Sequence, residues 1–255
     1  MGDLAALIWD VDGTLADTER DGHRVAFNKA FSQAGLAWHW DVDLYGKLLA
    51  VTGGKERIRY YLERFNPDWE SPSDLDRFIA DLHRRKSEIF VSLMEEGQIP
   101  PRNGVIRLIN EAAEAGLRLA IATTTTPANV DALLERFFGA SNKQPFEVIA
   151  AGDIVPAKKP APDIYRWALE KMDLSADECV AIEDSRNGFE SARSAGISTV
   201  VITVNGYTAD EDFGGASLIV DQLGESQSPA TLLGGVIDSA SMVDVGLLRR
   251  LHGLS

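Results

Sequence analysis

The strongest constraint on the fold of this chain is a short apolar run that ends in two closely spaced carboxylates. Residues Leu4–Trp9 predict a buried parallel strand, because such strands are covered on both faces and are apolar almost throughout. Asp10 and Asp12 follow, and Gly13 permits the chain to turn. Open α/β sheets bind ligands at the carboxyl ends of their strands, so the pair reaches the edge where a site is expected. For these residues alone, a solvated Asp-x-Asp-Gly turn is the alternative.

Length and charge restrict the class of protein and of partner. With 255 residues the chain can bury the core of one large domain or two modest ones. Its formal net charge of -14 argues against binding to nucleic acid or to an anionic membrane, because both would repel it. A small anionic substrate stays compatible with this charge, since a bound cation can dominate a local site.

Cysteine content and the absence of a recognisable targeting segment indicate a reducing compartment. The single cysteine, Cys179, lies in an apolar run and is expected to be a buried, inert thiol. The printed sequence contains neither a membrane-spanning apolar run nor a signal peptide. We therefore expect a cytoplasmic protein, or one of the plastid stroma if a transit peptide has been removed. We expect it to be a monomer.

From about residue 102 to residue 220 the chain alternates between helical patterns and short apolar runs. This alternation predicts right-handed crossovers and a mainly parallel sheet of the α/β class. The strands expected after the first are 117–122, 146–150, 179–182, 198–204 and 217–220. The helices expected between them are 104–116, 127–138, 162–172 and 187–195.

The segment 17–97 differs, because helix follows helix without a convincing strand. Helices are expected over 20–34, 43–50, 56–65 and 73–96. The insert begins just after the carboxylate pair, so we expect a lid over the ligand-binding edge of the sheet. The expected units are an α/β core (1–16 and 98–228), a helical cap (17–97) and a C-terminal extension (229–255).

Beyond about residue 225 the chain is Ser/Gly-rich, and within the expected extension it ends in an amphipathic stretch over 236–251. That stretch would pack on the core or on another subunit.

Polar residues at the ends of later strands complete a candidate site. Thr123 follows the second expected strand and could hold a phosphoryl oxygen, or make only a local hydrogen bond. Lys159 precedes a proline, which favours an extended backbone at the lysine; a solvated lysine is the alternative. Glu183 and Asp184 follow a later strand and open a helix, where Asp184 could serve only as an N-cap.

The carboxylates of separate strands are expected to converge. Asp10, Asp12 and Asp184 would lie at adjacent strand ends of one sheet. Three carboxylates and a phosphate dianion repel one another strongly unless a hard divalent cation and a lysine offset the charge. Mg²⁺ prefers oxygen ligands, keeps several waters and bridges to phosphate. The sequence therefore predicts a Mg²⁺ site at this edge of the sheet.

The order of these residues resembles the four motifs of the haloacid dehalogenase superfamily. The motifs are Asp10-x-Asp12-Gly13-Thr14, Thr123, Lys159-Pro160 and Glu183-Asp184. The resemblance extends to about Asp221 and implies a Rossmann-like parallel-sheet core with an inserted α-helical cap, similar to that of the β-phosphoglucomutase subfamily. The dehalogenase branch itself is disfavoured, because those enzymes lack an aspartate two residues after the nucleophile.

Further segments are similar to the CbbY proteins, a family of phosphatases that act on xylulose 1,5-bisphosphate, an inhibitory by-product of Rubisco. The matching segments are Asp17–Glu19, His23–Arg24, Ala26–Asn28, Trp40–Asp41, Thr52–Ile58, Thr123–Thr125, Ile149–Asp153 and Gly206–Thr208. The Gly-Gly-Lys-Glu-Arg loop is the most telling of them, because β-phosphoglucomutase carries a different loop there. The resemblance implies a Mg²⁺-dependent hydrolase whose partner is a small sugar phosphate.

The resemblance also implies a role for each motif residue. Asp10 would be the nucleophile that forms an aspartyl-phosphate, and Asp12 the general acid and base, protonated at the start. Lys159 and Thr123 would steady the transferring oxygens. The implied Mg²⁺ ligands are Asp10, the backbone carbonyl of Asp12, Asp184 and Glu183.

The cap would determine which substrate is accepted. Lys55, Arg57 and Lys86 would bind the distal phosphate of a bisphosphate, and a solvated helix charge is the alternative for each. His23 would bind sugar hydroxyls or relay a proton, unless it is a plain helix-surface residue. The other expected substrate contacts are Glu19, Thr124 and Thr125.

Two further functions stay open at this point. A phosphosugar mutase would use the same residues but pass the phosphoryl group to a sugar hydroxyl instead of to water. A receiver-type signalling module, which is not an enzyme, also carries acidic residues, threonine and lysine at strand ends. It is, however, about half as long and has no helical insert after its first strand. Dinucleotide binding is disfavoured, because no Gly-x-Gly-x-x-Gly follows the first strand.

Overall fold

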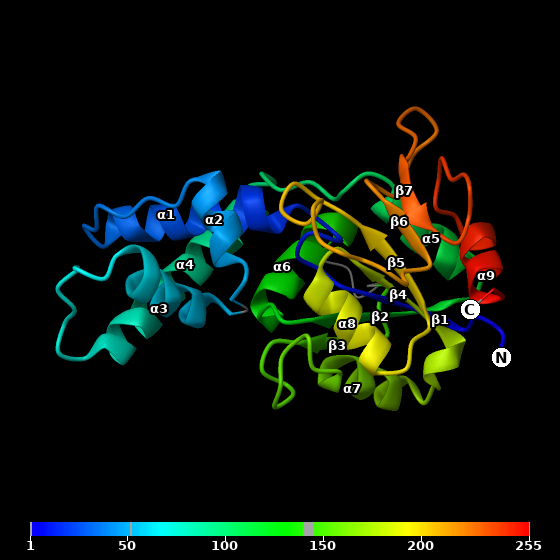
Figure 1. The fold of residues 1–255 in the computed structure, drawn as a ribbon, viewed down its shortest axis with the longest axis horizontal. Coiled ribbons are helices and arrows are strands. Elements are labelled where there is room, and N and C mark those ends of the chain that lie inside the picture. The colour runs from blue at the N-terminus through cyan, green and yellow to red at the C-terminus, as the bar shows by residue number, and fades with distance from the viewer. Residues whose placement is uncertain (1, 52, 140–144, 255) are drawn as a thin grey trace.

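The computed structural model describes residues 2–51, 53–139 and 145–254, which form two lobes side by side (Figure 1). The larger lobe is built on a seven-stranded sheet and the smaller one on helices. Thr52, in one of the CbbY-like segments, lies outside the described residues, as does Met1 at the start of the expected core.

The sheet of the larger lobe has the strand order β3-β2-β1-β4-β5-β6-β7. Strands β1 to β6 pair in parallel, and β7 runs antiparallel to β6. The predicted α/β class with a mainly parallel sheet is confirmed. The strands are β1 (Ala6–Trp9), β2 (Arg118–Thr123), β3 (Val148–Ala151), β4 (Cys179–Glu183), β5 (Thr199–Thr203), β6 (Leu218–Val220) and β7 (Leu232–Gly235).

Helices cover both faces of the sheet, which explains why its central strands are apolar throughout. In β1, Leu7 and Trp9 join the core beneath α5, α6 and α9, whereas Ala6 and Ile8 join the core beneath α7 and α8. All four of these side chains are fully buried. The helices of this lobe are α5 (Val105–Glu114), α6 (Pro127–Phe138), α7 (Asp163–Met172), α8 (Arg186–Ser194) and α9 (Val245–His252), with a 3₁₀ turn η2 (Ala176–Glu178) before β4.

The smaller lobe, called the cap below, has a separate core made largely of aromatic rings. Phe27, Phe31, Trp40 and Tyr45 are fully buried, and the ring centroids of Phe27 and Trp40 are 4.6 Å apart. Rings bury large apolar areas, so a few of them can stabilise a small lobe. The helices of the cap are a π-helical turn η1 (Glu19–His23), α1 (Arg24–Gln33), α2 (Val42–Leu48), α3 (Gly54–Phe65) and α4 (Leu75–Glu95).

The first cap helix differs from the single helix expected over 20–34. It opens with the π-helical turn Glu19–His23, and α1 begins only at Arg24. Gly22, in this turn, is packed so closely that a Cβ atom there would lie 2.4 Å from Ile99 Cδ1. The turn is thus set by packing against a segment far away in the sequence, which apolar periodicity within the helix cannot indicate.

The C-terminal residues contribute to the larger lobe. Residues 229–255, set apart above as an extension, supply β7 to the sheet and α9 to the core beneath it. The helix is shorter than the amphipathic stretch 236–251, because it begins only at the N-cap Asp244, whose Oδ1 accepts from the Leu247 amide at 2.6 Å. Its last residue, His252, has Nε2 3.1 Å from the Gly2 carbonyl oxygen, so the two ends of the chain meet.

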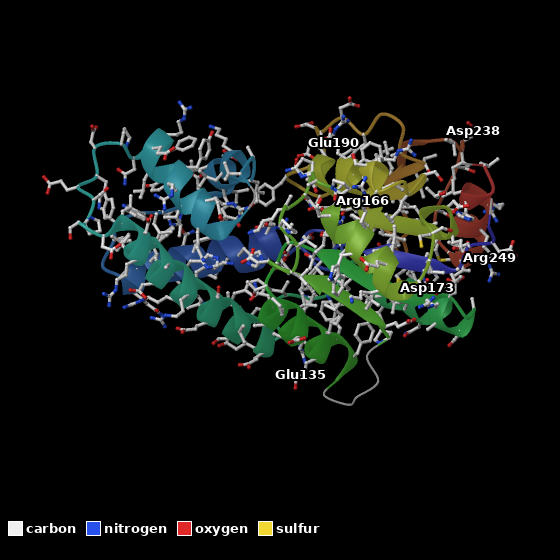
Figure 2. All side chains as sticks on the ribbon, turned by 90° about the horizontal axis from the view of Figure 1, so that it is seen from below. Glu135, Arg166, Asp173, Glu190, Asp238 and Arg249 are labelled. Carbon is white, nitrogen blue, oxygen red and sulfur yellow. The ribbon has the colours of Figure 1, made fainter. Side chains whose placement is uncertain are left out.

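Many charged side chains lie on the outside of this arrangement. Glu135 on α6 is exposed and points away from the sheet in Figure 2, and Arg166 on α7 is also exposed. Within the part of the chain that the structure describes, no helix combines the length and the apolar character needed to cross a bilayer.

Truncating a buried leucine of α9 tests whether the C-terminal helix is part of the cooperative fold. Leu248 is fully buried, whereas Leu254 is 66% exposed. We expect Leu248→Ala to lower the free energy of unfolding by about 2–5 kcal/mol, since it leaves a cavity in the core. Leu254→Ala should change it by less than about 0.5 kcal/mol. Urea unfolding measures both, and equal values for the two variants would show that α9 is not integral to the core.

Candidate active site

Three adjacent parallel strands deliver the central side chains of the site. Trp9, the last residue of β1, pairs with Ile121 of β2 on one side and Ile182 of β4 on the other. The residues that follow these three positions therefore lie next to one another at the carboxyl edge of the sheet. This register explains how Asp10, Thr123 and the Glu183–Asp184 pair, far apart in the sequence, reach one site.

Lys159 is the cation at the base of the site. Its Nζ lies 2.6 Å from Asp10 Oδ1 and 2.6 Å from Glu183 Oε1. The Tyr165 hydroxyl, from α7, donates to the same Glu183 oxygen at 2.5 Å. The pKa of Lys159 is held above its usual range, because the two carboxylates outweigh the effect of burial. The lysine is therefore charged and joins the ends of β1 and β4.

Asp184 is oriented by Asn205, which follows β5. Asn205 Nδ2 donates to Asp184 Oδ2 at 2.6 Å. Gly13 packs against the same carboxylate: a Cβ atom on Gly13 would lie 2.1 Å from Asp184 Oδ2, and its φ of +88° is one that other residues avoid. The turn after Asp12 is thus in close contact with Asp184.

The carboxylates carry more negative charge than the nearby cation offsets. Burial, with the charge of Glu183, raises the pKa of Asp10 to about 7 despite Lys159. Burial and the charges of Asp10 and Glu183 raise the pKa of Asp184 well above its usual range. Carboxylate oxygens of Asp10, Glu183 and Asp184 all lie within 4.8 Å of one another.

These residues fit a hard divalent cation. Glu183 Oε2 is buried and has no hydrogen-bond partner among the residues described. An unpaired buried carboxylate oxygen is costly, and oxygen ligands of this kind are what Mg²⁺ prefers. Asp10, Glu183 and Asp184 could therefore hold such an ion. Asp12 Oδ1, by contrast, is bound to cap residues, which leaves its backbone carbonyl as the expected contribution.

Asp12 is connected to the cap by a chain of hydrogen bonds. His23 Nε2 lies 3.0 Å from Asp12 Oδ1, and Lys86 Nζ lies 2.7 Å from His23 Nδ1. The Thr18 hydroxyl donates to the same Asp12 oxygen at 2.6 Å. When Lys86 is protonated, His23 Nδ1 must accept, so Nε2 carries the hydrogen that faces Asp12.

These hydrogen bonds determine the charge state of Asp12 in the free protein. Burial alone would raise its pKa, but His23, Thr18 and Lys86 stabilise the ionised form and lower the pKa to about 2. In the free protein these contacts therefore favour the ionised form of Asp12, and the protonated form that its expected role requires stays a prediction. Burial also lowers the pKa of Lys86 to about 8.

The threonine loop after β2 faces the same edge. Thr123 and Thr125 are buried, and Thr123 Oγ1 accepts a 3.3 Å hydrogen bond from the Thr125 amide. Asn129 of α6 donates to Thr125 Oγ1 at 3.0 Å. Thr124, between them, is half-buried. The loop ends at α6, whose N-terminus suits an anionic ligand.

The expected phosphate-binding cations of the cap have different surroundings. Arg57 is buried, donates to the Tyr45 hydroxyl at 2.7 Å and lies 3.5 Å from Glu19 Oε2. Glu19 also accepts a short hydrogen bond from Tyr45. Lys55 is exposed at the start of α3. Lys86 is buried with His23, as described above, rather than free to reach a ligand.

A cavity of about 1160 Å³ between the two lobes brings these groups together. All of the sequence-predicted site residues line it except Glu183, which is buried beneath it. The lining residues among them are Asp10, Asp12, Glu19, His23, Lys55, Arg57, Lys86, Thr123, Thr124, Thr125, Lys159 and Asp184.

Comparison with known proteins bears on what such a site does. A family model described as haloacid dehalogenase-like hydrolase matches residues 4–196. This chain belongs to the haloacid dehalogenase-like hydrolases. The resemblance drawn from its motifs is thereby confirmed, and the chain is an enzyme of the hydrolase class.

Among members of this hydrolase family, the chain is 48% identical to the plasmid-encoded protein CbbY of Cupriavidus necator over 226 residues, covering 89% of this chain and 88% of that one. It matches the crystal structure of CbbY from Rhodobacter sphaeroides in complex with phosphate with a TM-score of 0.78 and 47% identity, covering 86% of this chain and 94% of that one. A mutant of that CbbY, matched equally well, was crystallised with xylulose-(1,5)bisphosphate.

Sequence reasoning missed several residues that shape this hydrolase's site. Asn205 comes shortly after strand β5, much as Asp10 comes after β1, so its position could have been noticed. Tyr165 and Tyr45 lie inside helices and contact the site only through the packing of those helices. Only the fold could reveal them.

Substituting Gly13 tests the close contact with Asp184. Gly13→Ala should reduce kcat/KM for a small aryl phosphate by about 100-fold, because the added methyl group displaces a carboxylate of the site. Gly35→Ala is the matched control: its φ of +71° imposes similar backbone strain, but nothing lies within 4 Å of the added atom. The control should lose stability and keep its kcat/KM. A Gly13→Ala enzyme as active as the control would contradict the geometry.

Proposed function

We propose that this hydrolase is a Mg²⁺-dependent sugar-phosphate phosphatase that works through an aspartyl-phosphate on Asp10, and that its substrate is xylulose 1,5-bisphosphate. The observation that carries the proposal is the buried cluster in which Lys159 joins Asp10 to Glu183 next to Asp184. Support for the substrate comes from the 47% identity to a CbbY whose mutant was crystallised with that bisphosphate.

Asp10 is the proposed nucleophile. It lies at the end of β1 with its amide held by the Ile182 carbonyl at 3.0 Å, so its position is rigid. Its carboxylate attacks phosphorus, the bond from phosphorus to the sugar oxygen breaks, and an aspartyl-phosphate forms. Lys159 and the Thr123 hydroxyl, with the amides of the threonine loop, bind the transferring phosphoryl oxygens.

Asp12 is the proposed general acid and base. An arriving phosphate dianion adds negative charge beside it and so raises its pKa. The hydrogen-bonded chain from Lys86 through His23 then leads a proton to Asp12, which passes it to the departing sugar oxygen. In the second step Asp12 removes a proton from the water that hydrolyses the aspartyl-phosphate.

A Mg²⁺ ion held by Asp10, Asp184, Glu183 and the Asp12 carbonyl would supply charge neutralisation between the nucleophile and the phosphate. Asp184 is kept in place for this role by Asn205. One oxygen of Glu183 is bound to Lys159 and Tyr165, and the other has no partner among the described residues. Glu183 could therefore bind the lysine with one oxygen and the metal ion with the other.

The cap provides the proposed site for the second phosphate. Lys55 and Arg57 lie in the first turn of α3, where backbone amides and the helix dipole favour an anion. The cavity volume of about 1160 Å³ exceeds that of typical small-ligand pockets and leaves room for a sugar with two phosphates. Glu19 would bind sugar hydroxyls between the two phosphate sites.

Phosphate release from sugar mono- and bisphosphates tests this function directly. We expect one equivalent of inorganic phosphate from xylulose 1,5-bisphosphate with Mg²⁺, and no turnover in excess EDTA until Mg²⁺ is restored. Asp10→Asn should reduce kcat by at least about 10⁴-fold while the folded state persists. Asp131→Asn, an exposed aspartate on α6, is the matched control.

The outcomes separate the competing functions. Transfer of phosphate between sugars without release of inorganic phosphate would identify a mutase. Phosphate release in excess EDTA would exclude the proposed role of Mg²⁺ in offsetting the carboxylate charges. Near-normal turnover by Asp10→Asn would remove Asp10 as the nucleophile.

The pH dependence tests the link between Lys86 and Asp12. Lys86 has a pKa of about 8, so its charged fraction falls as the pH rises through that value. We expect kcat/KM to fall above pH 8 for both the bisphosphate and an aryl phosphate, because proton delivery to Asp12 serves either substrate. Lys86→Arg keeps the charge and should move this fall to higher pH. Lys29→Arg, an exposed change on α1, should not. A fall restricted to the bisphosphate would instead make Lys86 a contact of the distal phosphate.

A further inference from the structure

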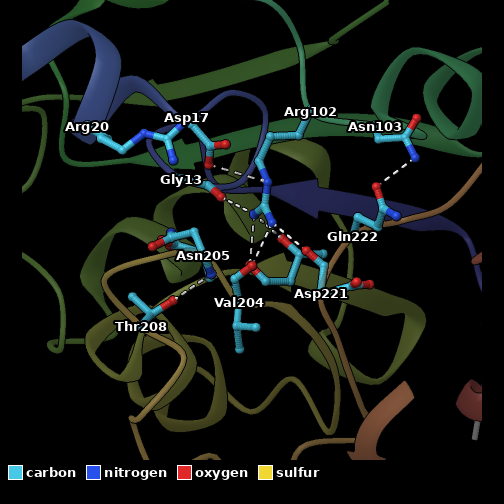
Figure 3. A network of polar contacts seen from close by, with 12 residues as sticks. Gly13, Asp17, Arg20, Arg102, Asn103, Val204, Asn205, Thr208, Asp221 and Gln222 are labelled. Carbon is cyan, nitrogen blue, oxygen red and sulfur yellow. Dashed lines mark hydrogen bonds and ion pairs between the residues drawn. The ribbon is translucent and has the colours of Figure 1, made fainter. Parts of the chain in front are cut away.

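Arg102 lies where the chain returns from the cap to the core, and it is the centre of the polar network in Figure 3. Its side chain is only 9% exposed. It belongs to the second of the two linkers between the lobes. The first linker runs beside it, since the Arg102 amide donates to the Leu15 carbonyl at 2.9 Å and Ala16 pairs with Pro101.

The guanidinium group of Arg102 binds acceptors from four separate segments. It donates to the carbonyl oxygen of Gly13, on the turn after Asp12. It donates to the carbonyls of Thr203 at 2.8 Å and Val204 at 2.6 Å, at the end of β5, and to that of Asp221, after β6, at 2.7 Å. Its remaining contacts are the Thr203 hydroxyl at 2.9 Å and Asp17 Oδ1 at 3.5 Å.

Two of these segments converge on Asp184. Gly13 packs directly against the Asp184 carboxylate, since a Cβ atom added to Gly13 would overlap Asp184 Oδ2. Asn205, the residue after Val204, donates to the same carboxylate. One planar cation therefore fixes the backbone on both sides of Asp184, at Gly13 and at Val204, without touching Asp184 itself.

We propose that Arg102 is a positioning residue that holds Gly13 and Asn205 around Asp184 and so keeps Asp184 in the orientation needed to bind a divalent cation. The inference rests on the metal site of the proposed function. Arginine suits the task because its fork of five donors has a fixed geometry, whereas lysine offers one flexible ammonium group.

A second arginine provides a contrast within the same lobe. Arg107 also binds backbone carbonyls, those of Leu223, Gly224 and Val243 at 2.9–3.2 Å. These carbonyls lie in the C-terminal part of the chain, and none of them adjoins a residue of the cation cluster. Arg107 therefore shares the structural function of a carbonyl clamp without the proposed positioning role.

Calorimetric titration of the chelator-stripped, full-length protein with MgCl₂ tests the proposal without relying on turnover. We expect Arg102→Lys to raise the Kd for Mg²⁺ by about 10–100-fold, the usual cost of losing a residue that orients a metal ligand. Arg107→Lys should leave this Kd within about twofold of the parent value. Both variants are expected to unfold at a lower temperature, so stability alone cannot distinguish them.

A milder variant covers the case in which Arg102→Lys does not fold. Thr203→Val removes one acceptor of Arg102 at nearly constant side-chain volume, and we expect a rise in Kd of about two- to tenfold. An unchanged Kd in the folded Arg102 and Thr203 variants, or an equal rise in Arg107→Lys, would overturn the positioning role and leave the proposed function standing. A parent protein that takes up no Mg²⁺ would overturn both.

Discussion

The contact of Lys159 with both Asp10 and Glu183 is the interaction on which the rest of the site depends. Buried ion pairs contribute little net stability, because desolvation offsets most of the Coulomb attraction, yet removing one partner costs about 3–5 kcal/mol. In this chain a single lysine faces three buried carboxylates, so burial and mutual repulsion raise the pKa of Asp10 and of Asp184. A bound cation would offset this repulsion, which is the role that the proposed function gives to Mg²⁺.

The register of the parallel strands brings these charged side chains together at one edge of the sheet. Side chains alternate between the two faces of a sheet along a strand. A shift of β4 against β1 by one residue would therefore move the Glu183 and Asp184 side chains each to the other face. The apolar residues before them, buried on both faces of the sheet, prevent such a shift. The packing of Leu7 and Ile8 is thus as necessary to the chemistry as the carboxylates, although neither touches the cavity.

Some of the site residues could be found from the sequence because their position follows from a strand ending, whereas Lys159 and the cap residues were found through their resemblance to family motifs. Asp10, Thr123 and Asp184 each come directly after a short apolar run, and the parallel topology then requires them to be neighbours. The charge state of Asp12 was out of reach, because it depends on His23 and Lys86, which a π-helical turn and a separate helix bring to it. Arg102 was out of reach for a similar reason: its acceptors are backbone carbonyls, and a backbone carbonyl has no signature in the sequence.

The contacts of Asp12 also suggest the cap's place in the proposed chemistry, beyond that of a cover. The two lobes are joined by linkers that adjoin Arg102, and the hydrogen-bonded chain from Asp12 to Lys86 crosses from one lobe to the other. Movement of the cap away from the core would break this chain and separate Asp12 from His23, through which the proposed mechanism delivers its proton. In the proposed mechanism Asp12 receives its proton through this chain, so proton delivery would require the cap to lie over the core as it does in this structure.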